Sequence, residues 1–153
     1  METIFFVRVL LGLLAIILIV VAVGDWRRRL IPNWLTGGIA ATAPVLWLLQ
    51  GYGIWPEIGI QVILATALFA LFVIFFAIGA MGGGDVKLIA ALGLWFPVNA
   101  MLNLLIIMSI LGGILTLAML AHHRLTKRNG QPEIPYGIAI AAAALWTIFQ
   151  TIS

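Results

Sequence analysis

The heptapeptide Met81-Gly82-Gly83-Gly84-Asp85-Val86-Lys87 decides how this chain is organised, because it places a carboxylate between two long apolar segments. One apolar segment ends at Ala80, and the next begins directly at Leu88. An ionisable side chain in such surroundings is costly to keep and indicates a functional site. We therefore look for a partner of Asp85 elsewhere in the chain.

The composition is that of an integral membrane protein. Of the 153 residues, 64% are hydrophobic and 8% are charged, whereas soluble domains carry about 25% charged residues. Lipid must cover much of this apolar surface, so we expect lipid contact and a single membrane-embedded domain over residues 1–153. The net charge of +3 does not indicate nucleic-acid binding, since seven of the eight Lys and Arg residues lie in short segments between apolar runs. The sequence has no cysteine, which excludes a disulfide, a thiolate nucleophile and a Cys-ligated metal.

Hydropathy predicts an all-α bundle of about six transmembrane helices. Residues 3–23 have bilayer length and are followed by the basic cluster, which favours a retained helix over a cleaved signal peptide. Residues 88–121 would form a helix of about 51 Å, too long for one comfortable crossing, and Pro97 offers a break. The fourth helix is therefore expected to be short, either a full crossing or a re-entrant return. The other helices are expected at about 33–49, 58–80, 100–121 and 135–152.

The basic residues predict the orientation of this bundle. The connections 24–33, 81–87 and 122–133 lie on one side and hold seven basic residues, against Arg8 elsewhere. The positive-inside rule places these connections in the cytoplasm and both termini outside. Asp25 and Asp85, the two aspartates of the sequence, then lie at the same membrane face although they are 60 residues apart.

Two carboxylates that share one site can perform acid–base chemistry. They do not easily both ionise, so one pKa rises and the pair can share a proton. The ionised member can take a proton from water while the other donates a proton to a carbonyl oxygen. Asp25 and Asp85 could thus hydrolyse a peptide bond without a metal, a serine or a cysteine. The run Gly82–Gly84 can adopt positive φ and lets backbones approach closely, so an extended substrate could lie across it beside Asp85.

Each feature also has a simpler interpretation when it is taken alone. A single acid at a membrane boundary is often a solvated helix end, and three glycines often form a flexible turn or a helix-packing strip. Arg27–Arg29 are expected to anchor the orientation. His122 and His123 are expected to be solvated in a basic loop, so neither a metal nor another cofactor is predicted.

The features together resemble the prepilin peptidase family, the bacterial branch of the membrane aspartyl proteases with a Gly-x-Gly-Asp motif. The resemblance runs in order from about residue 15 to the end. It is carried by Asp25, Ile31-Pro32-Asn33, Gly82-Gly83-Gly84-Asp85-Val86-Lys87-Leu88 and Ile134-Pro135-Tyr136-Gly137-Ile138-Ala139-Ile140. It implies a six-helix protease of the bacterial inner membrane that removes the basic leader of type IV prepilins or pseudopilins at the cytoplasmic face. The resemblance also implies an association with pilus-assembly or secretion machinery.

The resemblance implies a role for each matching residue. Asp25 and Asp85 would be the catalytic dyad. Lys87 would either act beside Asp85 or anchor the helix by snorkelling. The motif and substrate-positioning residues would be Gly82, Gly83, Gly84 and Lys87, and the supporting residues would be Pro32, Asn33, Pro135, Tyr136 and Gly137.

One departure from the family and three alternatives bear on this interpretation. Larger prepilin peptidases carry an N-terminal region with paired Cys-x-x-Cys motifs that is linked to N-methylation of the new pilin terminus. This chain starts at its first apolar segment without cysteine, so it looks like the minimal form associated with tight-adherence (Flp) pili, and methyltransferase activity is not expected.

The alternatives are a proton-coupled transporter, a non-enzymatic pilus-assembly scaffold and a presenilin-type or signal-peptide-peptidase-type intramembrane protease. Asp25 precedes Trp-Arg-Arg-Arg at a membrane boundary, which argues against the last of these.

Overall fold

The computed structural model describes residues 2–125 and 134–152, and all regular structure in these ranges is helical. The elements are α1 (Glu2–Arg28), α2 (Asn33–Gln50), the short π-helical turn η1 (Ile54–Ile58), α3 (Gly59–Ala77), α4 (Gly83–Gly93), α5 (Val98–Leu125) and α6 (Tyr136–Ile152). The predicted all-α bundle is confirmed.

Three helical segments of the described ranges are long and apolar enough to cross a membrane. They are α1, the continuous segment Ile54–Ala77 and the segment Val98–His123 of α5, while α6 is a shorter apolar helix. Large apolar side chains on the outer faces of these helices, such as Ile16, Ile74 and Ile110, are more than half exposed. Exposed apolar surface on this scale requires lipid around it, so the chain is a membrane protein.

The short helix α4 lies inside the bundle. It has 11 residues and is about 16 Å long, roughly half the thickness of the hydrocarbon layer. It packs against α2, α3, α5 and α6, and Leu88, Ile89 and Leu92 on it are completely buried. The chain turns back at Pro97, so the predicted short fourth helix and the break after it are confirmed.

Two tryptophans tie the end of α4 to α2. Trp47 Nε1 donates a hydrogen bond to the carbonyl oxygen of Leu94 at 2.9 Å. Trp95 Nε1 donates to the carbonyl oxygen of Ile39 at 2.7 Å. A chain that reverses direction within a membrane protein needs such partners, because lipid offers its backbone none.

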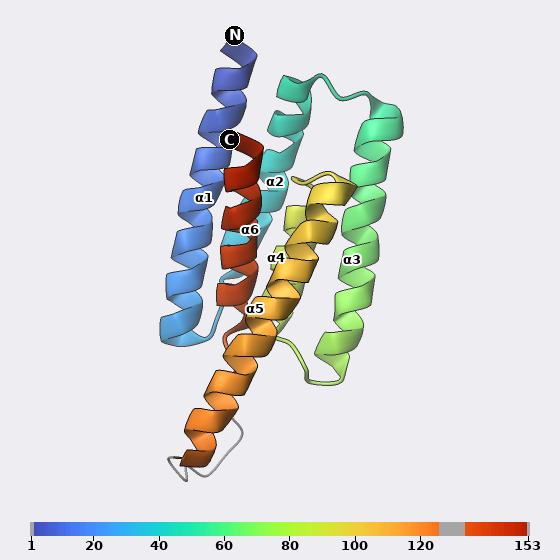
Figure 1. Ribbon diagram of the computed structural model, residues 1–153. Coiled ribbons are helices and arrows are strands. Elements are labelled where there is room, and N and C mark those ends of the chain that lie inside the picture. Colours follow the sequence, from blue (N-terminus) through green and yellow to red (C-terminus); the bar gives the residue numbers. More distant parts are fainter. Residues whose placement is uncertain (1, 126–133, 153) are drawn as a thin grey trace.

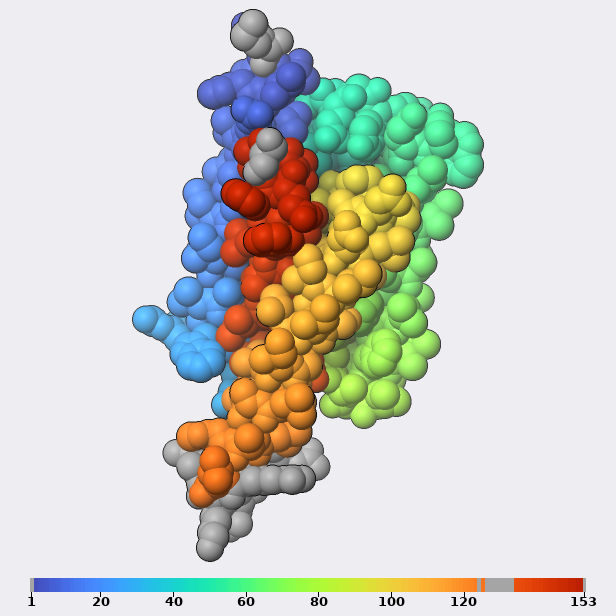
Figure 2. Space-filling view, viewed as in Figure 1, coloured from blue at the N-terminus to red at the C-terminus, as the bar shows by residue number. Residues whose placement is uncertain are grey.

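The connections are distributed between the two ends of the bundle. Both chain ends and the α2–α3 connection lie at one end, while residues 29–32, residues 78–82 and the start of α6 lie at the other (Figure 1). We call the latter the aspartate end, because Asp25 and Asp85 lie there. In the space-filling view, α5 crosses the face between α6 and α3 and extends beyond the other helices at this end (Figure 2).

The first helix is longer than predicted. It continues to Arg28, so Asp25 lies in its last turn and not in the polar connection. Arg27 and Arg28 suit this last turn because their charges oppose the partial negative charge of a helix C-terminus. The next residue, Arg29, has a positive φ of 51°, which takes the chain out of the helix.

The prediction that residues 81–87 form a connection was wrong, because α4 already begins at Gly83. Gly82 has φ −73° and ψ 147° and caps the helix, while Asp85 lies in the first turn, where an acid is favourable. In the connection between α3 and α4, the glycine with positive φ is Gly79, at 75°, after α3 has ended at Ala77. Gly82, Gly83 and Gly84 therefore serve other purposes than positive φ.

Candidate active site

The two aspartates lie in one cavity at the aspartate end. Asp25 comes from the last turn of α1 and Asp85 from the first turn of α4, and both side chains are buried, with 5% and 7% of their surface exposed. They line a cavity of about 390 Å³ and are close enough to repel each other electrostatically. The other residues that line this cavity are Arg29, Leu30, Ile31, Asn33, Gly82, Gly83, Gly84 and Lys87.

Asp25 faces the N-terminus of α6. The backbone N–H groups of Gly137 and Ile138 lie beside its carboxylate, and the Arg29 side chain attracts it electrostatically. A helix N-terminus carries unpaired N–H groups and a partial positive charge, so it is a favourable neighbour for a carboxylate. Among the described residues, no group forms a hydrogen bond with Asp25 Oδ2.

Gly137 leaves the space that the Asp25 carboxylate occupies. A Cβ atom at this position would lie 2.7 Å from Asp25 Oδ2 and 2.9 Å from Asp25 Cγ. Any larger residue would displace the carboxylate or push α6 away from α1. The close approach of α6 to Asp25 therefore requires a glycine here.

The Asp85 side chain lies at the N-terminus of its own helix, α4. Its Oδ2 accepts a hydrogen bond from the Gly82 N–H at 3.3 Å. Burial, together with the negative charge of Asp25, raises the pKa of Asp85 to about 7, although the hydrogen bond from the Gly82 N–H opposes the shift. A carboxyl group with such a pKa can hold or release a proton near neutral pH. Asp85 thus has the property of an acid–base catalyst.

Ile31 lies between two helix starts at the site, although the sequence did not single it out as a site residue. A Cβ atom on Gly84 would lie 2.9 Å from Ile31 Cβ, and one on Gly137 would lie 2.9 Å from Ile31 Cδ1. The buried Ile31 side chain thus fits between the starts of α4 and α6. The sequence did not mark Ile31, because the neighbouring Leu30 is apolar as well. Arg29, which faces Asp25, was also missed.

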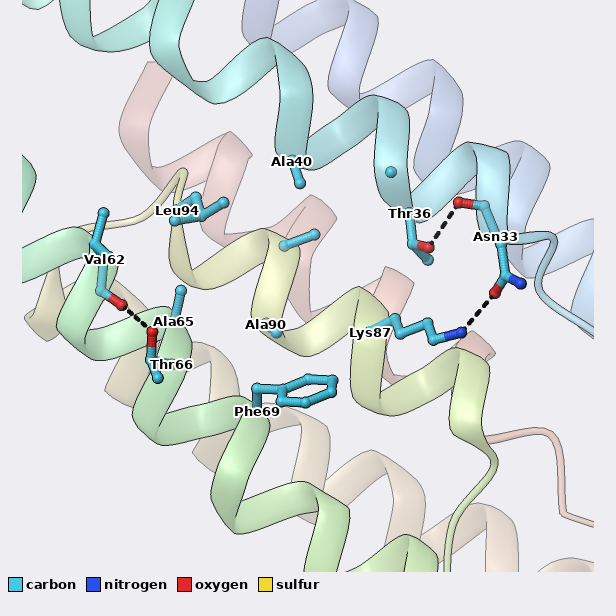
Figure 3. A pocket seen from close by; sticks show the side chains of 12 residues that line it. Asn33, Thr36, Ala40, Val62, Ala65, Thr66, Phe69, Lys87, Ala90 and Leu94 are labelled. Atoms are coloured by element: carbon cyan, nitrogen blue, oxygen red, sulfur yellow. Dashed lines mark hydrogen bonds between the residues drawn. The ribbon is translucent and has the colours of Figure 1, made fainter.

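Lys87 and Asn33 connect α4 with the start of α2. Lys87 Nζ donates a hydrogen bond to Asn33 Oδ1 at 2.9 Å (Figure 3). Both residues line the cavity that holds the aspartates. Pro32 precedes them as the extended residue that caps α2. The structure therefore brings Lys87, Asn33 and Pro32 together at the edge of the site.

The segment Pro135–Gly137 holds the start of α6 in place. The Tyr136 ring lies against Gly112 of α5, where an added Cβ would meet it at 3.4 Å. The Tyr136 hydroxyl lies 3.3 Å from Thr116 Oγ1. Pro135 is buried, and its carbonyl oxygen accepts a hydrogen bond from the Ile138 N–H at 3.3 Å. These contacts position the N–H groups that face Asp25.

The predicted polar loop 122–133 is only partly described. His122 and His123 lie in the last turns of α5, which corrects their placement in a loop, and residues 126–133 lie outside the described ranges. Within residues 2–125 and 134–152, no group of three His, Cys, Asp or Glu side chains could hold a metal ion.

Gly83 packs against the Phe76 ring of α3. A Cβ atom added at Gly83 would lie 3.3 Å from this ring.

Comparison with known protein families identifies the chain. A family model described as the type IV leader peptidase family matches residues 12–117, which is more than half of the sequence and includes both aspartates. The chain belongs to the type IV leader peptidase family. Searches among curated proteins and among solved structures gave no match.

The site of this leader peptidase family member extends beyond the residues that the family model matches. The matched range ends before Pro135, Tyr136 and Gly137. The contacts of Gly137 with Asp25 nevertheless make that segment part of the site. The site thus draws on the ends of α1, α4 and α6, although the family match does not extend to α6.

Proposed function

We propose that this chain is an aspartic endopeptidase that removes the short basic leader of a type IV prepilin or pseudopilin at the cytoplasmic face of the bacterial inner membrane. The observation that carries the proposal is that Asp25 and Asp85 line one cavity. Membership of the type IV leader peptidase family supports the choice of substrate.

The two carboxyl groups have different tasks in the proposed reaction. The Asp25 carboxylate, with an oxygen that lacks a hydrogen-bond partner among the described residues, takes a proton from a water molecule. The oxygen of this water attacks the peptide carbonyl carbon while protonated Asp85 donates its proton to the carbonyl oxygen. The tetrahedral intermediate then returns that proton to Asp85, the C–N bond breaks, and the leaving nitrogen takes the proton held by Asp25. Both groups regain their starting protonation states.

The position of the dyad suits a bond at a membrane boundary. Both aspartates lie at helix ends, and Arg27 and Arg28 end the same helix as Asp25. The proposed substrate has a basic leader in the cytoplasm and an apolar helix in the membrane, so the bond between them lies at that boundary. Arg27–Arg29 would orient the enzyme and would not bind the leader, since both carry positive charge.

Substitution of each aspartate by asparagine tests the dyad. We expect Asp25→Asn and Asp85→Asn to lower the rate of leader removal by about 100-fold or more, because each removes one proton-transfer group. The assay is co-expression with each candidate prepilin, followed by measurement of the mass of the product, whose new N-terminus should lack a methyl group. Glu57→Gln is the matched control, because Glu57 lies in η1, at the other end of the bundle.

Three outcomes would contradict the proposal. Full processing by either aspartate variant would exclude the dyad. Proton-coupled transport by wild-type protein in reconstituted vesicles, without leader removal from any prepilin, would favour a transporter. A protein that supports pilus assembly without both aspartates would be a scaffold.

A further inference from the structure

A second groove lies beside the catalytic cavity. It has a volume of about 480 Å³ and runs between α2 and α3, with α4 as its floor (Figure 3). Gly37 and Ala40 line it on the α2 side, Ala65 on the α3 side and Ala90 on the floor. These small side chains leave the groove unfilled.

The groove exists because α2 and α3 hardly contact each other within the described ranges. Each of them packs against α4 instead. On the two walls, Gly37 of α2 and Val62, Thr66 and Phe69 of α3 are exposed. The groove is therefore open along the side of the bundle that would face lipid.

The two threonines in the groove already have hydrogen-bond partners on their own helices. Thr36 Oγ1 donates to the carbonyl oxygen of Asn33 at 3.1 Å. Thr66 Oγ1 donates to the carbonyl oxygen of Val62 at 2.7 Å. The walls thus offer mainly apolar surface, which suits an apolar helix better than a polar peptide.

The groove adjoins the catalytic cavity. Asn33 and Lys87 line both of them. A helix that lay in the groove with one end at the Asn33–Lys87 pair would continue directly towards Asp25 and Asp85. The wall of α2 from Asn33 to Ala40 is about 10 Å long, which matches roughly two turns of a helix.

We infer that this groove binds the apolar helix of the substrate, a single-span prepilin, with the N-terminal end of that helix at the Asn33–Lys87 pair. The inference rests on the proposed function, because the cleaved bond must then lie just beyond the end of the docked helix. Small residues on the groove walls allow close contact between helices in lipid, where packing drives association.

Two neighbouring glycines of α2 provide a matched test. Gly37 lines the groove and Gly38 does not. Both are helical and exposed, and an added Cβ would meet nothing within 4 Å at either position. Gly37→Leu and Gly38→Leu thus change helix propensity equally, but only Gly37→Leu fills the groove. We expect Gly37→Leu to slow leader removal by about tenfold or more, and Gly38→Leu to stay within about twofold of wild type. Equal rates in the two variants would overturn the inference.

Cross-linking tests docking without cleavage. The chain has no cysteine, so Gly37→Cys and Gly38→Cys can each be introduced singly, in an Asp85→Asn background that retains the substrate. A prepilin with a single cysteine in the first two turns of its apolar helix should form a disulfide with the Gly37→Cys variant and not with the Gly38→Cys variant. Equal cross-links to both variants would show contact without preference for the groove, and cross-links to neither would leave lipid as its occupant; either result would overturn the inference.

The two assays separate this inference from the proposed function. Leader removal by wild type with equal rates in Gly37→Leu and Gly38→Leu would leave the peptidase intact and exclude the groove. A selective cross-link at position 37, without leader removal by wild type, would support docking and exclude the peptidase.

Discussion

At the scale of single residues, the two aspartates differ in the helix ends that surround them. Asp25 faces the N-terminus of α6 and lies near Arg29, so groups of positive character approach it from two sides. Asp85 faces the N-terminus of its own helix, and a single N–H group, from Gly82, donates to it. This asymmetry supports the assignment of Asp25 as the base and Asp85 as the acid.

The pKa of Asp85 predicts how leader removal depends on pH. Because burial and the negative charge of Asp25 raise this pKa to about 7, Asp85 carries its proton below that pH and loses it above. The acid is therefore lost as the pH rises, and we expect the initial rate to fall through about pH 7. The rate should be measured with purified enzyme and prepilin in vesicles of constant composition, with Gly38→Leu as a control that should follow the wild-type profile. A rate that stays constant or increases up to about pH 9 would contradict Asp85 as the acid.

The sequence predicts the chemistry of the site better than its packing. Asp25 and Asp85 stand out because charges are rare in an apolar chain, and charge bias places both at one face. Ile31 has no such signal, because one apolar residue among 64% hydrophobic residues does not reveal that two glycines leave room for it. The purpose of Gly137 likewise depends on a contact between α6 and α1, which no local pattern contains.

At the scale of helices, α4 is the element on which the site depends. Pro97 indicates in the sequence where α4 must end. The start of α4 within the glycine run was not predicted, because glycine normally disfavours helix. The helix forms there since Asp85 suits the first turn and its inner face is enclosed by neighbouring helices. Two glycines in the first turn are thus compatible with a helix when packing, and not propensity, stabilises it.

We expect the Trp95 hydrogen bond, which joins the end of α4 to α2, to stabilise the folded protein. Trp95 is buried and donates to the Ile39 carbonyl oxygen. We expect Trp95→Phe to lower the free energy of unfolding by about 1–3 kcal/mol, because it removes the buried donor but keeps an aromatic ring. Thermal unfolding in detergent would measure the change. Trp146→Phe is the control, since Trp146 is 51% exposed, and equal effects of both substitutions would contradict the role of this hydrogen bond.

At the scale of the whole molecule, charge is unequally divided between the ends of the bundle. Arg27–Arg29 and Lys87 lie at the aspartate end. Arg8 lies towards the other end, where its guanidinium donates to the carbonyl oxygen of Ile152 at 3.5 Å. The connections expected on one side of a six-helix bundle still lie at one end, although α4 is too short to cross the membrane. The chain enters the bundle along α4, turns, and returns along α5 to the aspartate end (Figure 1).

Cysteine labelling would test the orientation that the proposed function requires. The cysteine-free sequence allows single substitutions at exposed residues of the two ends, Ala80→Cys at the aspartate end and Ile54→Cys at the other. Because the basic residues lie at the aspartate end, the positive-inside rule predicts that Ala80→Cys reacts with a membrane-impermeant maleimide only in inverted vesicles, and Ile54→Cys only in intact spheroplasts. Neither substitution changes a charge, so neither should alter the orientation. The reverse labelling pattern would place Asp25 and Asp85 on the face opposite the cytoplasmic leader and would exclude cleavage there.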